Sequence, residues 1–186
     1  MFSVLFLSSC CIFTSQDCNC DSSDKDLSEA AQSWLAPYPE EELFIFEDTT
    51  GLLDTFVVTL SSEMVDCGGD ECPAMCNVVT AKLASKTNNY SYSIVGENSF
   101  IRINVDTSLN ASFSPESNKV IGNDHTTILF HDQFQWKGQS IHALEVKCPD
   151  GSNCSSNQEI QNLIISKDFG PIQFSTASGQ KWEKTN

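Results

Sequence analysis

The sequence predicts an all-β domain, built either as one antiparallel curved sheet or as a two-sheet sandwich, with one short helix near the N-terminus. Short apolar segments recur from residue 43 onward, several alternate apolar with polar residues, and turn-forming Gly, Asn and Asp separate them. Strands at this spacing, joined by short turns, are typical of antiparallel sheets. The 186 residues suffice for one domain with a hydrophobic core, which we assign to residues 27–186.

The helix is expected at residues 27–36, ahead of the first strand. Asp26 or Ser28 is a suitable N-cap, and Pro37 and Pro39 end the helix. Its apolar residues fall on one side at helical spacing, namely Leu27, Ala31, Trp34 and Leu35. We expect this helix to close one end of the β core.

The strands are expected in two groups. The first group begins with a hairpin whose turn, at residues 48–51, ends in Gly51. Its strands are residues 43–46, 52–60, 78–83, 90–94 and 101–105. A polar stretch around residues 114–124 separates it from the second group, which consists of residues 126–136, 141–147, 160–167, 172–176 and 181–183.

The first nine residues are typical of a signal segment, and Cys10 is the expected site of lipidation. Small residues follow a short apolar run, and Cys10 has Leu at its −3 position and Ser at −1. The run is too short to cross a membrane, which takes roughly 20 apolar residues. It has no basic residue before it, which a start upstream of Met1 would supply. The alternatives are an N-terminal element packed into the domain and an ordinary cleaved signal.

Residues 10–26 are expected to be an acidic, flexible tether between the lipid and the domain. Ser, Asp, Asn and Cys dominate this stretch, which has almost nothing to bury. A flexible chain of this length spans about 20–25 Å root-mean-square, enough to hold a domain clear of a membrane.

The charge of the chain argues against nucleic acid as a partner. Ten basic residues stand against 25 acidic ones, and the formal net charge is −15. Phosphate backbones are bound by clustered Lys and Arg, but Arg102 is the one arginine. The acidity suits a domain kept apart from its neighbours by charge.

Nine cysteines without a CxxC pair predict disulfides in an oxidising compartment rather than a metal site. Cys148 and Cys154 flank a loop between two expected strands and are the favoured pair. Cys67, Cys72 and Cys76 lie in a second loop, where a bridge would pin the connection between strands. An acidic cation site at Asp66, Asp70 and Glu71 is the alternative for that loop. We predict no cofactor, and the remaining connectivity stays open.

No catalytic motif stands out. His131 and Asp132 are adjacent, and His142 on the following strand could meet them across the sheet. No nucleophile elbow or phosphate-binding loop appears. The favoured function is therefore a binding or interaction module, with a protein, a glycan or a small ligand as partner. The alternatives are an envelope hydrolase using His131 and Asp132 and a purely structural component.

The last hairpin carries a resemblance. An apolar strand leads to Gly170-x-Ile172-x-Phe174 and then to Gly179-x-x-Trp182. This pattern resembles the closing hairpin of small Bacteroidota (flavobacterial-type) lipoproteins. The early hairpin around Phe44-x-Phe46 and Gly51 is similar to theirs as well. The resemblance implies a lipid-anchored protein of the cell envelope, at the outer membrane or the cell surface, and it carries over no catalytic residues.

Overall fold

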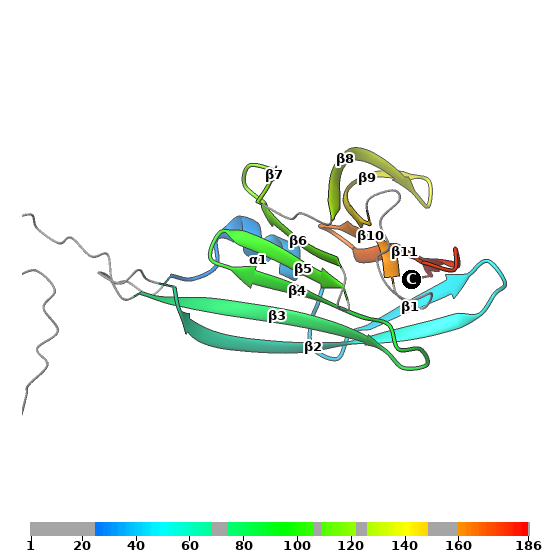
Figure 1. Ribbon diagram of the computed structural model, residues 1–186, viewed down its shortest axis with the longest axis horizontal. Helices are drawn as coiled ribbons and strands as arrows, with labels where there is room; N and C mark the ends of the chain where they lie inside the picture. The colour runs from blue at the N-terminus through cyan, green and yellow to red at the C-terminus, as the bar shows by residue number, and fades with distance from the viewer. Residues whose placement is uncertain (1–24, 68–73, 106–108, 122–125, 149–159, 186) are drawn as a thin grey trace, which may run out of the picture.

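A computed structural model describes residues 25–67, 74–105, 109–121, 126–148 and 160–185 (Figure 1). In this part of the chain one helix accompanies twelve strands, and all twelve belong to a single sheet. The all-β prediction is confirmed. Of the two architectures considered, the molecule has the curved antiparallel sheet, and the two-sheet sandwich is wrong.

The helix is α1 (Glu29–Leu35). The strands are β1 (Leu43–Asp48), β2 (Leu53–Asp66), β3 (Met75–Ser85), β4 (Ser91–Glu97), β5 (Phe100–Val105), β6 (Leu109–Ser114), β7 (Lys119–Val120), β8 (Thr127–Trp136), β9 (Gln139–Lys147), β10 (Ile160–Ser166), β11 (Gly170–Thr176) and β12 (Lys181–Lys184).

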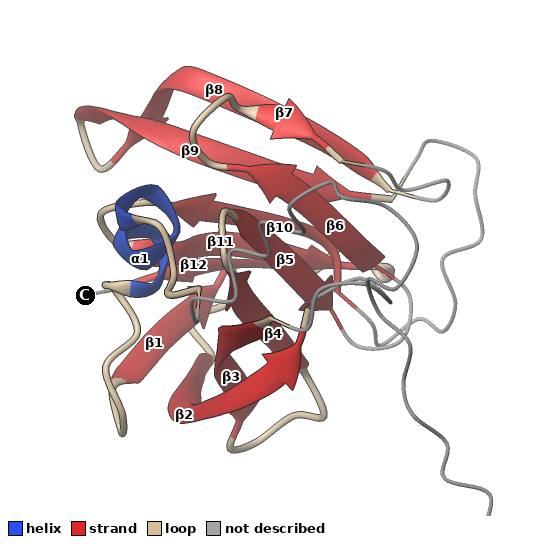
Figure 2. Ribbon diagram, turned by 90° about the vertical axis from the view of Figure 1, so that its left-hand side faces the viewer, coloured by secondary structure: helices blue, strands red, loops and turns tan. Residues whose placement is uncertain are grey.

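The sheet curls until it nearly closes on itself (Figure 2). Its strand order is β7-β6-β5-β4-β3-β2-β1-β12-β11-β10-β9-β8, so consecutive strands lie side by side except for β7 and β8. The first and last strands also pair, with Phe46 opposite Lys184 and Asp48 opposite Trp182. The two edges of the sheet are therefore β7 and β8, which follow one another in the chain.

Aromatic side chains fill the concave side of the sheet. Phe46 lies 5.3 Å from Phe56 and 5.1 Å from Phe174, edge to face in both cases. Trp182 stacks on Phe174 at 5.8 Å, and Trp182 and Phe174 are each 1% exposed. The alternation in β1 and β2 produces this core, because successive side chains of a strand point to opposite faces.

Helix α1 packs against β4 and β5, as its apolar face predicts. It begins after Ser28, whose Oγ accepts a hydrogen bond from Ala31 N at 3.2 Å, so Ser28 rather than Asp26 is the cap. Gly96 in β4 permits the close approach, because a Cβ there would stand 2.7 Å from Leu35 Cδ1.

Strands β2 and β3 extend beyond β1 as a long hairpin, visible along the bottom of Figure 1. Pairing with β1 ends at Val57, whereas pairing with β3 continues until Asp66 meets Met75. We call residues 59–66 and their partners 75–82 the arm. Cys67 and Cys76 form a disulfide at its end. Lys25 pairs with β3 there, donating its N–H to Met75 O at 2.8 Å.

A second apolar cluster lies apart from the main core. It consists of Trp136, Ile141, Ala143, Ile164 and Ile172. Partly buried Phe134 and Phe169 pack against it. The register of β8 on β9 shifts between His131 and Phe134, and such a bulge bends a strand and strengthens its twist.

The structure adds two strands to those expected. β6 was not expected, although Leu109, Ala111 and Phe113 are fully buried and alternate with polar residues. β7 has two residues and lies in the stretch expected to be an irregular polar segment. β2 also runs six residues past its expected end at residue 60, because β3 pairs with it as far as Asp66. The expected signal and residues 10–24 of the expected tether, including Cys10, lie outside the described residues. The end of the expected tether is not a free segment, because Lys25 is bonded to β3.

Candidate functional site

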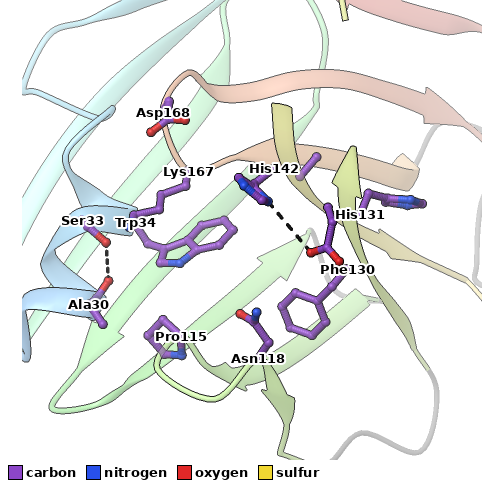
Figure 3. A pocket seen from close by; sticks show the side chains of 12 residues that line it. Ala30, Ser33, Trp34, Pro115, Asn118, Phe130, His131, His142, Lys167 and Asp168 are labelled. Atoms are coloured by element: carbon purple, nitrogen blue, oxygen red, sulfur yellow. Dashed lines mark hydrogen bonds and ion pairs between the residues drawn. The ribbon is translucent and has the colours of Figure 1, made fainter. Parts of the chain in front are cut away.

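A cleft of about 340 Å³ lies where the two edges of the sheet approach without pairing (Figure 3). Its walls come from α1, the β6–β7 turn, β8, β9 and the β10–β11 turn. The cleft thus depends on segments drawn from much of the chain, between Ala30 and Asp168. Its size is at the lower end of the range for small-molecule sites, roughly 300–1,000 Å³.

Aromatic rings form a row beneath the cleft. Trp34 of α1 meets Phe113 of β6 edge to face at 5.1 Å, and Phe113 meets Phe130 of β8 at 5.7 Å. The row links β6 to β8 where backbone pairing stops. Trp34 and Phe130 line the cleft, and Figure 3 shows the indole at its centre. Sequence reasoning assigned Trp34 to the core and missed this second role.

Polar side chains surround the aromatic row and are mostly exposed. Asp132 Oδ1 lies 3.9 Å from His142 Nδ1, and the two side chains are 89% and 76% exposed. Lys167 and Asp168 project from the β10–β11 turn, and Asn118 comes from the β6–β7 turn. Asn118 has a φ of 51°, a left-handed conformation that asparagine tolerates better than most residues.

The structure pairs His131 with Glu145 rather than with Asp132. His131 Nε2 lies 2.9 Å from Glu145 Oε2, and Asn162 Nδ2 donates to Glu145 Oε1 at 2.8 Å. In Figure 3 the His131 ring points away from the other side chains of the cleft. Adjacent residues of a strand face opposite sides, so His131 and Asp132 point apart. The histidine that approaches Asp132 is His142.

The arrangement offers hydrogen bonds and an apolar floor rather than an assembled catalytic group. At 3.9 Å the Asp132–His142 contact is too long to orient the imidazole by a hydrogen bond. The Ser33 hydroxyl, which also lines the cleft, donates to Ala30 O at 2.6 Å. Within the described ranges no group of three or more His, Cys, Asp or Glu side chains could hold a metal ion.

A second, larger and shallower depression of about 570 Å³ lies beside β1 and β12. Two of its lysines are already engaged: Lys137 Nζ donates to Thr185 O at 2.8 Å, and Lys184 Nζ donates to Phe169 O at 3.0 Å. Burial lowers the pKa of Lys184, with nearby Lys137 adding to the effect. These ammonium groups hold the chain in place, so this depression is the weaker candidate.

The structure tests part of the predicted disulfide pattern and shows one complete pair among the residues it describes. Cys67 is bonded to Cys76, which pins the loop at the end of the arm. Cys148 is disulfide-bonded as well, but Cys154 lies outside the described residues, so that pairing stays a prediction. Cys72, Asp70 and Glu71 also fall outside, and the alternative cation site is likewise untested.

No helix in the part of the chain that the structure describes is long and apolar enough to cross a membrane. Comparisons of the chain with protein-family models, with curated proteins and with solved structures give no match. The resemblance to Bacteroidota lipoproteins therefore stays a prediction.

Proposed function

We propose that the protein is a lipid-anchored binding module of the cell envelope, at the outer membrane or the cell surface. We further propose that the cleft holds a short, uncharged glycan. The observation that carries this proposal is the aromatic row under a polar rim, at the one place where the edges of the curved sheet approach without pairing.

The chemistry of the cleft favours a sugar over an apolar or strongly charged ligand. The face of a sugar ring is lined with C–H groups, which pack on aromatic rings such as those of Trp34 and Phe130. Its hydroxyls both donate and accept, as do the side chains of Asn118 and His142. Two carboxylates, Asp132 and Asp168, stand against the ammonium group of Lys167, so the cleft carries charges of both signs. The net charge of −15 also disfavours an acidic glycan.

An envelope hydrolase is the second possibility, and the geometry favours it less. A general base must be held within hydrogen-bond reach of its target and is usually oriented by a partner. His142 is 76% exposed, and no hydrogen bond from its ring to Asp132 orients it. His131 is oriented by Glu145 but points away from the cleft. A role as a structural envelope component is the outcome if no ligand binds.

The binding proposal is tested by titrating the chain with neutral oligosaccharides and following binding by calorimetry. We expect His142→Ala and Asn118→Ala each to weaken binding by about 5- to 10-fold, because each removes roughly 1 kcal/mol of hydrogen bonding. Lys167→Ala should also weaken binding. Lys181→Ala, which changes an exposed lysine outside the cleft, is the matched control and should leave the affinity unchanged. Binding that survives the three cleft changes would place the ligand elsewhere.

The anchor is tested separately from the ligand. Intact mass of the protein extracted from its native membrane should exceed that of the unmodified chain by the mass of acyl groups. Cys10→Ser should remove this excess in mass and release the protein from the membrane fraction, because the acyl chains at Cys10 are the proposed anchor. An unmodified mass in both proteins would exclude lipidation at Cys10.

A further inference from the structure

The arm presents a strand edge with no strand neighbour among the described residues. Val58 is the last residue of β2 with backbone-to-backbone bonds to the segment before β1, donating its N–H to Glu42 O at 3.0 Å and accepting from Glu41 N at 3.1 Å. Residues 59–64 follow, and all six are exposed. An exposed edge of this kind is a template for a further strand.

The side chains at this edge form an apolar strip. Leu60 is 36% exposed and Met64 is 48% exposed. Both share a sheet face with Met75, which pairs with Asp66 and is 39% exposed. The N–H and C=O groups of Val58 both point toward β1, and in an antiparallel ladder every second residue repeats this direction. The backbone groups of Leu60, Ser62 and Met64 therefore point away from β3, toward the side of the arm that has no strand. Hydrogen-bonding groups and apolar side chains therefore coincide on one short segment.

The edge is self-complementary in one antiparallel register. Centring two copies on Ser61 would set Met64 opposite Val58 of the second copy, whose backbone groups are already bonded within its own chain. Centring them on Glu63 would set two carboxylates directly opposite one another, which is destabilising. Centring them on Ser62 keeps the Glu63 carboxylates apart and pairs Leu60 with Met64 of the second copy. Val58 then falls opposite Asp66, so the ladder ends at the Leu60–Met64 pairs.

We propose that a second copy of this chain docks on the arm, edge to edge and antiparallel, with Ser62 at the two-fold axis. The pairing joins the two sheets and makes the two apolar strips continuous. So short an edge buries less than the roughly 800 Å² per partner of a standard interface, and the dimer is accordingly weak, with a Kd on the order of 0.1 mM. A net charge of −15 on each copy opposes pairing, so salt strengthens it.

Glu40 competes with this pairing within each chain. Its carboxylate accepts the hydrogen bond from Leu60 N, one of the groups that point along the open side. A second copy must displace that carboxylate in order to bond Leu60. Removing the Glu40 side chain should therefore strengthen the dimer, whereas a change that removes an edge hydrogen bond should weaken it.

The first test is sedimentation equilibrium of the full chain carrying Cys10→Ser, which excludes any lipid contribution. Ser62→Pro deletes the central donor but leaves the β2–β3 ladder intact, since this N–H points away from β3. We expect it to weaken the dimer at least about 10-fold, because two symmetry-related hydrogen bonds are lost. Ser62→Ala keeps the N–H and is the control, and Glu40→Ala should tighten the dimer about threefold.

The second test reads the register directly and does not depend on the proline variant folding. Ser62→Cys sets two thiols at a hydrogen-bonded pair with Cα atoms about 5.5 Å apart, within the span of a disulfide. Mild oxidation should then give a dimer that reductant reverses. Ser61→Cys adds the same number of thiols but places them diagonally, and it should remain largely monomeric. A parent chain that stays monomeric at ~1 mM in high salt, or equal crosslinking of the two variants, overturns the proposal.

Discussion

Two tyrosine hydroxyls are buried in the core in an unusual way. Tyr38 is 1% exposed and Tyr92 is 2% exposed, and neither hydroxyl has a hydrogen-bond partner among the residues that the structure describes. Burial raises the pKa of both phenols well above the usual value, and the pKa of Tyr92 is raised further by Tyr38. A buried hydroxyl without a partner costs stability, whereas the ring around it contributes.

Replacing both residues by phenylalanine should therefore stabilise the protein. Tyr38→Phe with Tyr92→Phe keeps the rings and removes the unpaired groups, so we expect a gain of about 1 kcal/mol in the free energy of unfolding. Urea denaturation at pH 7 measures it. The gain should grow above pH 10. Because the tyrosine pKa is higher in the folded than in the unfolded state, the parent protein loses stability as pH rises past the unfolded pKa, and the phenylalanine variant does not. A loss of stability at pH 7 would indicate that the hydroxyls are bonded.

Asp48 shows the opposite behaviour. Hydrogen bonds from the side chains of Gln180 and Thr50, with the N–H groups of Leu52 and Thr50, lower the pKa of Asp48 to about 2 from its usual value of 3.8. The Gln180 contact, 2.8 Å to Oδ2, joins the β1–β2 turn to the last hairpin. Because the pKa of Asp48 is lower in the folded than in the unfolded state, its carboxylate stabilises the folded protein at pH values above the unfolded pKa. This stabilisation is lost as pH falls through the folded pKa.

The Asp48→Asn variant should accordingly have a lower Tm than the parent protein at neutral pH. The difference should stay constant down to pH 3.8 and shrink as pH falls toward 2, where Asp48 itself is protonated. Calorimetric scans of both proteins from pH 7 to pH 2 measure the difference. A constant difference over this range would show that the charge of Asp48 does not contribute.

The arm behaves as an element with its own local stability. Its disulfide joins Cys67 and Cys76, which are separated by nine positions in sequence. A crosslink across so short a loop is worth roughly 2–3 kcal/mol to the segment it closes. The outer part of the arm lies beyond β1, however, so it can open while the rest of the sheet stays folded.

Removing the disulfide should loosen the arm more than the domain. In a Cys67→Ala, Cys76→Ala double variant we expect amide exchange at residues 75–79 to become at least about 10-fold faster, in proportion to the lost local stability. Exchange at residues 53–57, which β1 covers, is the internal control and should change little. Equal acceleration in both segments would mean that the arm and the sheet unfold together.

Sequence patterns predicted ten of the twelve strands and the helix, because each carries local apolar alternation or spacing. The two misses have physical causes. In β6 the inward residues include small Ala111, and the outward Asn110 and Ser112 are poor strand formers, so the segment gains its stability from its neighbour β5. The two residues of β7 form no pattern at all and are a strand only because Val120 pairs with Phe113.

The cleft was less predictable than the strands. His142 and Asp132 were named from the sequence, but the choice of partner between His131 and His142 depends on which face of β8 and β9 each residue occupies. A bulge in β8 decides this locally, and sequence does not reveal its position. Trp34 and Lys167 reach the cleft only because α1 and the β10–β11 turn lie near the open edges of the sheet.

At the scale of the whole molecule, the pairing of β1 with β12 holds the curved sheet together. Trp182 is the main side chain of this seam: it is 1% exposed, stacks on Phe174 and meets the ring of Tyr90 at 6.4 Å. Its partner across the strands is Asp48 of β1, so the seam depends on contacts of very large sequence separation.

Trp182→Ala should therefore destabilise the protein severely, by about 3–5 kcal/mol, because it opens a large cavity in the core. Guanidinium denaturation measures this loss. Trp136→Ala is the matched control: Trp136 belongs to the smaller cluster and is 7% exposed, so its loss should cost less. An equal or greater effect at Trp136 would show that the seam is not the main stabilising contact.

The seam also sets the time at which the protein can fold. β12 is synthesised after every other described strand, yet β1 near the start of the domain needs it as a neighbour. A growing chain can form the local β2–β3 hairpin early, but it cannot complete its core until residues 181–184 have left the ribosome. The domain thus remains open until β12 is available, and an open chain is the state in which a polypeptide can be threaded through a translocation channel. For a protein that we propose is exported, a strand that arrives late lengthens the time during which the domain is unfolded and competent for passage across a membrane.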